Sequence, residues 1–207
     1  MVDVSEILKD VSVEFTPMFW TAVATIILSP LIWNIVSRLE YNTRFMTKIF
    51  GNKTVACYIF AIYVFFFSLF RDIVFKFAVV QGSDLKHLIP EQLALPHLIL
   101  TAILYVVGGV LVLGSSIRLK IIGTYCGDYF DIFPFDAPIK SFPFNVCNNP
   151  MYVGSSLLFL AFAVQFLSPT GFILTALTAI VYKVALFYEE PFTQEIYKKK
   201  AEMEKKD

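Results

Sequence analysis

The sequence predicts an all-α fold: a polytopic helical integral membrane protein with about four to five apolar helices, the last two forming a hairpin. Of its 207 residues, 57% are hydrophobic and only 16% are charged, whereas soluble domains contain about 25% charged residues. The mean hydropathy is +0.67. Uncharged stretches long enough to cross about 30 Å of hydrocarbon recur along the chain. One membrane-embedded domain, residues 1–207, is expected, ending in a short soluble basic tail at residues 194–207.

The first two apolar segments cover residues 15–37 and 54–70. Pro17, Pro30 and Asn34 interrupt the first, so it is expected to be a kinked or re-entrant helix. The second is rich in Tyr and Phe and continues past Arg71 and Asp72. Because a long Arg side chain can reach the head groups, this pair is expected at a membrane boundary.

The third apolar segment covers residues 93–117 and is followed by a mixed loop at residues 123–149. Aromatic residues, prolines and aspartates alternate in this loop, a composition that suits the head-group region of a bilayer. The loop is therefore expected to lie at the membrane surface.

Residues 141–182 contain no charged residue, which is too long a run for one span. Residues 168–171 (Ser-Pro-Thr-Gly) have the composition of a turn, so helices are predicted at about 150–167 and 172–188, with Asn149 as the N-terminal cap of the first. An antiparallel hairpin would place Asn149, Tyr152 and the pair Glu189–Glu190 on one membrane face. The lysine-rich tail shares that face, and such flanks favour the cytoplasm.

The adjacent carboxylates Glu189 and Glu190 follow the last apolar segment. Because neighbouring like charges repel, at least one is expected to face protein or a ligand. A cation, or a molecule with an amine and several hydroxyls, is the natural ligand. The alternative is a solvated helix end.

Charge and cysteine content narrow the choice of partners. The formal net charge is +0, so no nucleic-acid partner is expected. The three cysteines and two histidines lack metal-ligand spacing, so no metal is expected. The acidic residues 1–14 also lack the pattern of a cleavable signal peptide.

Several segments, in order along nearly the whole chain, resemble motifs of the phospholipid N-methyltransferases. They are residues 30–34 (Pro-Leu-Ile-Trp-Asn), 38–40 (Arg-Leu-Glu), 123–130 (Gly-Thr-Tyr-Cys-Gly-Asp-Tyr-Phe), 142–145 (Phe-Pro-Phe-Asn), 148–154 (Asn-Asn-Pro-Met-Tyr-Val-Gly) and 188–193 (Tyr-Glu-Glu-Pro-Phe-Thr). The chain is most similar to the fungal and animal enzymes that methylate phosphatidylethanolamine derivatives to phosphatidylcholine. It is more distantly similar to isoprenylcysteine carboxyl methyltransferases.

This resemblance implies S-adenosylmethionine as the methyl donor and an amine as the acceptor. It assigns the donor site to the Glu-Glu pair, here Glu189 and Glu190, and to a Gly-x-Gly in the third apolar segment, here Val106, Val107 and Gly108. The first glycine is thus replaced by Val106, which can serve through its backbone but hinders a closer approach. The alternative for Gly108 is close packing of another membrane helix.

The donor carries an ammonium, a sulfonium, a carboxylate and a ribose diol. One glutamate can hold the ammonium while the other accepts from ribose hydroxyls or orients the acceptor amine. Tyr152 can face the sulfonium or act as an interfacial anchor. The acceptor amine must lose a proton before attack, and Glu189, Glu190 and Asp128 are the candidate acceptors. Asp128 can instead cap its loop.

The predicted function is methylation of the head-group amine of phosphatidyl-N-methylethanolamine and of the dimethyl form, and also of phosphatidylethanolamine, giving phosphatidylcholine. Two alternatives stay open: a related membrane methyltransferase acting on a prenylcysteine carboxylate or a small thiol, and a non-catalytic membrane scaffold or lipid-binding protein. The resemblance implies a multi-pass protein of the endoplasmic reticulum membrane, with mitochondrial membranes as a second location.

Overall fold

The computed structural model describes residues 13–82, 84–135 and 139–205, and within these ranges it contains helices and no strand. The prediction of an all-α fold is confirmed. In chain order the elements are α2 (Pro17–Thr43), α3 (Phe45–Phe50), α4 (Lys53–Gln81), η1 (Lys86–Leu88), α5 (Glu91–Thr124), η2 (Gly127–Phe130), α6 (Pro150–Phe166) and α7 (Pro169–Met203).

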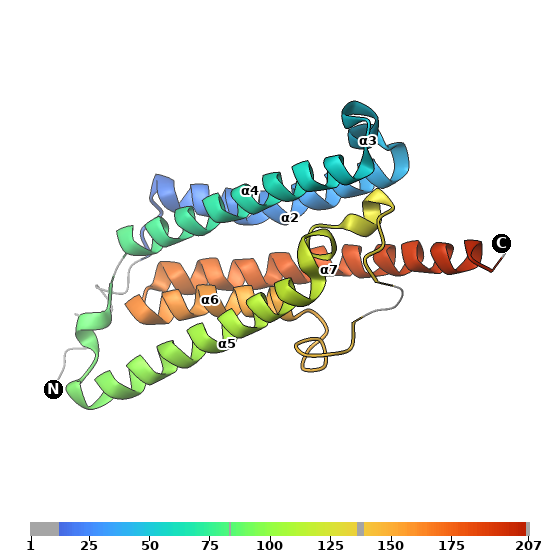
Figure 1. Ribbon diagram of the computed structural model, residues 1–207. Helices are drawn as coiled ribbons and strands as arrows, with labels where there is room; N and C mark the ends of the chain where they lie inside the picture. The colour runs from blue at the N-terminus through green and yellow to red at the C-terminus, as the bar shows by residue number, and fades with distance from the viewer. Residues whose placement is uncertain (1–12, 83, 136–138, 206–207) are drawn as a thin grey trace.

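Four of these helices, α2, α4, α5 and α7, are long and apolar enough to cross a membrane, and α6 is a shorter apolar helix. Helix α2 packs on α4 and α7, and α6 packs on α5 and α7 (Figure 1). The predicted number of apolar helices is therefore confirmed. The bundle places α3, η2 and the C-terminal part of α7 at one end (Figure 1).

Helix α2 is one continuous helix of 27 residues, about 40 Å long. It begins at Pro17 after Thr16, whose Oγ1 accepts a hydrogen bond from the Phe19 amide at 3.1 Å. It continues through Pro30, and the Asn34 amide donates to the Pro30 carbonyl at 3.0 Å. Of the two expected forms, a re-entrant segment is disfavoured, because one continuous helix of this length is long enough to cross the hydrocarbon.

Arg71 and Asp72 lie inside α4, not at its end, and their expected position at a membrane boundary stays a prediction. Arg71 precedes the last residue of α4 by ten positions, about 15 Å along the helix. Its side chain is buried, and its Nη1 donates to the Tyr182 hydroxyl of α7 at 2.7 Å. Its Nη2 donates to Asp72 Oδ1 at 2.9 Å. The guanidinium is therefore held by partners within the protein.

Helices α5 and α6 cross closely at two glycines. A Cβ at Gly108 would lie 2.9 Å from the Gly154 carbonyl oxygen, and one at Gly154 would lie 2.7 Å from that of Gly108. The lack of side chains thus lets the two backbones approach, as in many membrane helix pairs.

The predicted hairpin is present, with α6 and α7 joined at Leu167 and Ser168. Leu167 adopts the left-handed conformation, and Ser168 Oγ accepts from the Gly171 amide at 3.3 Å. Helix α7 runs much further than the predicted residue 188. It continues because Ile196 is buried against the cluster that contains Phe60 and Tyr129, so packing extends beyond the apolar run. Glu189 and Glu190 therefore lie in the interior of a helix that includes residues 194–203.

Candidate active site

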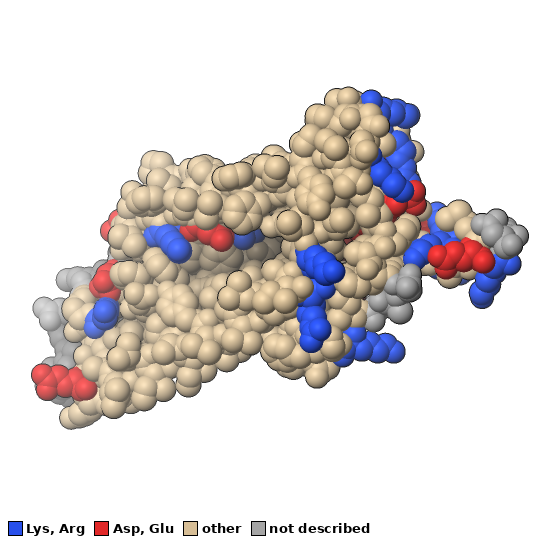
Figure 2. Space-filling view, viewed as in Figure 1, with Lys and Arg blue, Asp and Glu red and all other residues tan. Residues whose placement is uncertain are grey.

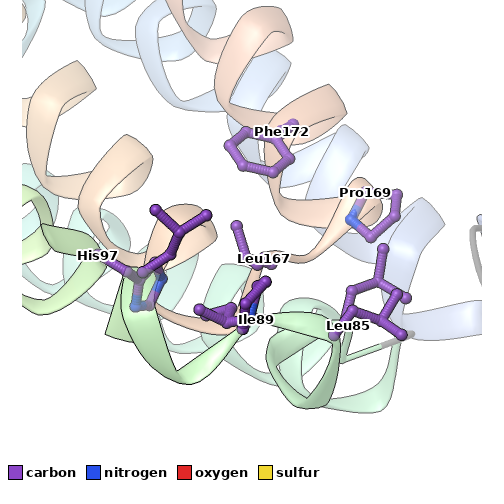
Figure 3. Close-up of a pocket in the computed structure, with 9 residues that line it drawn as sticks. Leu85, Ile89, His97, Leu167, Pro169 and Phe172 are labelled. Atoms are coloured by element: carbon purple, nitrogen blue, oxygen red, sulfur yellow. The ribbon is translucent and has the colours of Figure 1, made fainter. Parts of the chain in front are cut away.

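The largely apolar cavity beside the α6–α7 turn lacks the chemistry of an active site. It has a volume of about 570 Å³ and is lined by leucines, prolines, Ile89, Phe172 and His97 (Figure 3). His97 Nε2 lies 2.7 Å from the Val164 carbonyl oxygen, so the imidazole is used within the fold. Because α6 and α7 are antiparallel, this cavity lies at the opposite end of the hairpin from Glu189.

The other end of the hairpin brings the two glutamates against the start of α6. The Tyr152 hydroxyl donates to Glu189 Oε2 at 2.6 Å, and the Asn149 amide donates to Glu190 Oε1 at 2.7 Å. The predicted meeting of these four residues on one face is confirmed. Asn149 is the N-cap residue of α6, as predicted, but its side chain makes no capping bond, because its amide donates to Glu190 instead.

A polar cavity of about 770 Å³ adjoins this cluster. Side chains from the end of α5, η2, the following loop and α7 line it, and among them are Glu189 and Asp128. Glu189 is half-buried, whereas Glu190 is exposed and is not one of the lining residues among those that the structure describes. The structure thus separates two neighbouring carboxylates that the sequence could not distinguish.

The polypeptide turns sharply after α5, and this turn carries Asp128 to the cavity. Backbone φ angles are positive at Lys120, Cys126 and Asp131. The buried rings of Tyr129 and Phe130 then anchor η2 in the core. Asp131 forms an ion pair with Lys53 at 3.2 Å, while Asp128 lines the cavity. The two aspartates of the loop therefore have different roles.

Tyr182 and Arg71, which sequence reasoning did not assign to the site, hold the ring of Tyr152 in place: Tyr182 packs on that ring, and Arg71 donates to Tyr182. The rings of Tyr152 and Tyr182 pack edge to face, with centroids 4.9 Å apart, and Tyr182 accepts the hydrogen bond from Arg71. This arrangement orients the hydroxyl that Glu189 accepts from. The sequence did contain a signal for this region: Arg71 is a charged residue within an apolar segment, and such residues often mark functional regions in membrane proteins.

Residues 106–108, which correspond to the family's Gly-x-Gly, lie on a part of α5 away from the polar cavity. Val106 and Val107 are exposed, at 63% and 44%, and Gly108 packs against Gly154. Within the described part of the chain, none of the three lines the polar cavity, whose first residue on α5 is Leu119. Eleven residues separate Gly108 from Leu119, about 16 Å along the helix. Their assignment to the donor site stays a prediction, and the structure gives Gly108 a packing contact.

Basic side chains collect at the end of the molecule that carries the site. Figure 2 shows Lys and Arg gathered over α3, the end of α5 and the C-terminal part of α7. Apart from a small group of blue and red side chains in the left half, the surface between the two ends of the molecule is tan in this view. The polar cavity therefore lies at the basic end of an apolar bundle.

Comparison with known proteins places the chain among sequences of one family. The sequence profile of the family described as "Phospholipid methyltransferase" matches residues 96–200. Phosphatidylethanolamine N-methyltransferase A of Dictyostelium discoideum is 41% identical, with 89% of this chain and 85% of the relative covered. Phosphatidylethanolamine N-methyltransferase of Homo sapiens is also 41% identical, with coverages of 89% and 90%. Phosphatidyl-N-methylethanolamine N-methyltransferase of Emericella nidulans is 42% identical, with coverages of 88% and 86%.

No solved structure matches the chain. The profile covers about half of the sequence, and the three relatives cover most of it at identities of 41% to 42%. The prediction of an enzyme of this class is confirmed: the chain belongs to the phospholipid methyltransferase family.

Proposed function

We propose that this protein transfers a methyl group from S-adenosylmethionine to the head-group amine of phosphatidyl-N-methylethanolamine and of the dimethyl form, giving phosphatidylcholine, and that it also accepts phosphatidylethanolamine. The names of its relatives support this substrate class. The observation that carries the proposal is the polar cavity at the end of the α6–α7 hairpin, where Glu189 and Asp128 face one space and Tyr152 orients Glu189.

The cavity suits a donor with several charged and polar groups. Its volume of about 770 Å³ lies within the range of small-molecule sites, about 300–1,000 Å³. A carboxylate of the Glu189–Glu190 pair would hold the donor ammonium or accept from its ribose hydroxyls. The ring of Tyr129, which lines the cavity, is an aromatic surface for the sulfonium, whereas Tyr152 acts through its hydrogen bond to Glu189. The resemblance adds Val106, Val107 and Gly108 to the donor site, and the variant Gly108→Ala tests that part.

The reaction is an in-line displacement in which the N–C bond forms as the S–C bond breaks, and the bonding electron pair stays on sulfur. Positioning the two reactants supplies much of the rate. The amine must first give up its proton so that its lone pair is free. Among the residues that the structure describes, Glu189 and Asp128 are the carboxylates that line the cavity, and we assign the proton to one of them. Glu190, which is exposed, is the weaker candidate.

The decisive assay incubates membranes containing the protein with labelled S-adenosylmethionine and mono- or dimethylated phosphatidylethanolamine. Labelled phosphatidylcholine is expected, and label no higher than in membranes from a vector control would refute the proposal. Competition between this lipid and a prenylcysteine substrate separates the enzymatic alternative. A thermal shift with S-adenosylmethionine separates the non-catalytic one, because a bound ligand stabilises the folded state.

Variants of the glutamates test the donor site directly. Glu189→Gln is expected to weaken donor binding about 10- to 100-fold, since hydrogen bonds to charged groups contribute about 1.5–3 kcal/mol. Glu190→Gln is expected to weaken it less, because Glu190 does not line the cavity. Glu195→Gln is the matched control: Glu195 lies on the same helix, and its exposed side chain pairs with Lys199 at 2.7 Å. Equal donor affinity in all three variants would contradict this assignment.

We place the enzyme in the endoplasmic reticulum membrane, with mitochondrial membranes as a second location, and its basic end toward the cytoplasm. The Lys and Arg clusters at that end support this orientation (Figure 2). Labelling of Cys147 in sealed membrane vesicles tests it. Protection of Cys147 from a cytoplasmic thiol reagent would contradict it.

A further inference from the structure

A groove of about 490 Å³ lies between α2 and α7, and its walls are mostly apolar. From α2 it is lined by Ile27, Leu31 and Ile35, and from α7 by Ile180 and Val184. These five side chains are exposed on helices long enough to span a membrane. The groove therefore opens directly to the hydrocarbon of the bilayer.

Two polar side chains mark one end of this groove. Asn34 and Arg38 both line it and stand one helical turn apart on α2. Arg38 Nη2 donates to the Tyr188 carbonyl of α7, and its guanidinium lies over the Phe192 ring, 4.5 Å from the centroid. A guanidinium has five N–H donors, and among the described residues only Nη2 donates to the protein. Arg38 thus keeps donors for a ligand at the polar end of the groove.

The groove and the polar cavity follow one another along α7. Ala185 lines the groove, and Glu189, one turn later, lines the cavity. From the middle of the membrane outward, the order is apolar walls, then Arg38, then Glu189. Arg38 is bonded to the residue that precedes Glu189, so the cation and the carboxylate are neighbours.

This order matches that of an ethanolamine phospholipid, in which acyl chains are followed by a phosphate and, two carbons further, an amine. We propose that the α2–α7 groove is the binding site of the phospholipid substrate, with an acyl chain along the apolar walls, the phosphate on Arg38 and Asn34, and the amine at Glu189. The proposal rests on the proposed function, and it adds the route by which a lipid reaches the site without leaving the bilayer. Arg38 is then a substrate-binding residue, and guanidinium–phosphate pairs are among the stronger polar contacts.

Kinetics in vesicles of phosphatidylcholine containing dimethylated phosphatidylethanolamine test the role of Arg38. Arg38→Gln is expected to raise the KM for the lipid, expressed as a surface fraction, about 10- to 100-fold. Its dissociation constant for S-adenosylmethionine, measured by calorimetry without a lipid substrate, is expected to stay within about twofold of wild type. An unchanged lipid KM, or an equal loss of affinity for lipid and donor, would overturn the assignment.

A second variant tests the groove without touching its charge. Leu31→Trp fills the space between α2 and α7, whereas Leu28→Trp adds the same ring at an exposed position of α2 outside the groove. Leu31→Trp is expected to lose at least tenfold in kcat/KM on a long-chain lipid and much less on a dihexanoyl lipid. Leu28→Trp is expected to behave as wild type on both. Equal behaviour of the two variants would overturn the proposal, and this comparison decides the matter if Arg38→Gln does not fold.

The wild-type protein separates failure of the groove from failure of the function. If it forms no labelled phosphatidylcholine, the proposed function is wrong. If it does so while the Leu31 and Arg38 variants keep wild-type lipid kinetics, the function stands and the groove is not the substrate site.

Discussion

Replacing one of two adjacent glycines in α5 separates a packing role from a donor-binding role. A Cβ at Gly108 would lie 2.9 Å from the Gly154 carbonyl oxygen and 3.0 Å from Leu158 Cγ, whereas a Cβ at Gly109 meets nothing within 4 Å. The first contact is with backbone, so α5 and α6 must move apart. Overpacking of this kind costs about 1–3 kcal/mol.

Comparing Gly108→Ala with Gly109→Ala removes the other contributions. Both substitutions gain the same helix propensity, about 0.5–1 kcal/mol, so their difference isolates the packing cost. For a chain of this size, about 1–3 kcal/mol corresponds to a Tm difference of roughly 2–12 °C. Gly108→Ala is therefore expected to unfold at the lower temperature, and Gly109→Ala at or slightly above that of wild type.

Thermal unfolding in detergent, with and without S-adenosylmethionine, provides the measurement. If Gly108 acts through packing, the destabilised variant keeps its donor affinity, and the ligand raises its Tm as much as that of wild type. Equal unfolding temperatures for the two variants would refute the packing argument. Loss of donor affinity at unchanged Tm would support the assignment of Gly108 to the donor site. Gly154→Ala should be at least as destabilising, because its Cβ would meet three atoms at 2.7–2.9 Å.

Three further variants follow from contacts described above or from a buried carboxylate. Tyr152→Phe removes the hydroxyl that donates to Glu189 and should weaken donor binding about tenfold or more in calorimetry; unchanged affinity would remove Tyr152 from the site. Arg71→Leu removes the hydrogen bonds to Tyr182 and to the half-exposed Asp72 and should destabilise the protein by about 1.5–3 kcal/mol, with partial recovery when Asp72→Leu is added; additive effects in this cycle would contradict the pairing. Glu40→Ala removes a buried carboxylate that accepts from the first turn of α3, so Tm should fall by several degrees; no change would show that α3 needs no such acceptor.

The sequence predicted the architecture well because membrane helices follow directly from long apolar segments. The hairpin was predictable too, since residues 168–171 combine turn-forming residues within an uncharged stretch. Its geometry then brought Tyr152 and Asn149 to the glutamates, as the hydrogen bonds show. The positions of these residues could be predicted because they depend only on the apolar segments, the turn between them and the direction of the chain.

The errors arose where contacts distant in sequence decide the structure. Arg71 is buried inside the bundle because Tyr182, 111 residues later, accepts its hydrogen bond. Helix α7 continues beyond the apolar run because Ile196 packs against the cluster that holds η2. Glu189 and Glu190 face different surroundings because one lies beside a cavity formed by a distant loop. None of these neighbours is visible in the local sequence.

The distance in sequence between Arg71 and Tyr182 has a consequence for the biosynthesis of the chain. Ribosomes add about 5–20 residues per second, so the 111 residues between the two take about 6–22 s to translate. Throughout that interval the apolar helix α4 holds, inside its length, an arginine that lacks its Tyr182 partner, and an arginine at the centre of a membrane helix costs about 2.5–3.5 kcal/mol. Asp72, the very next residue, is available from the start and lies 2.9 Å from the guanidinium in the finished fold. The neighbouring carboxylate thus gives Arg71 a partner while α4 is in the bilayer and α7 has not yet been synthesised.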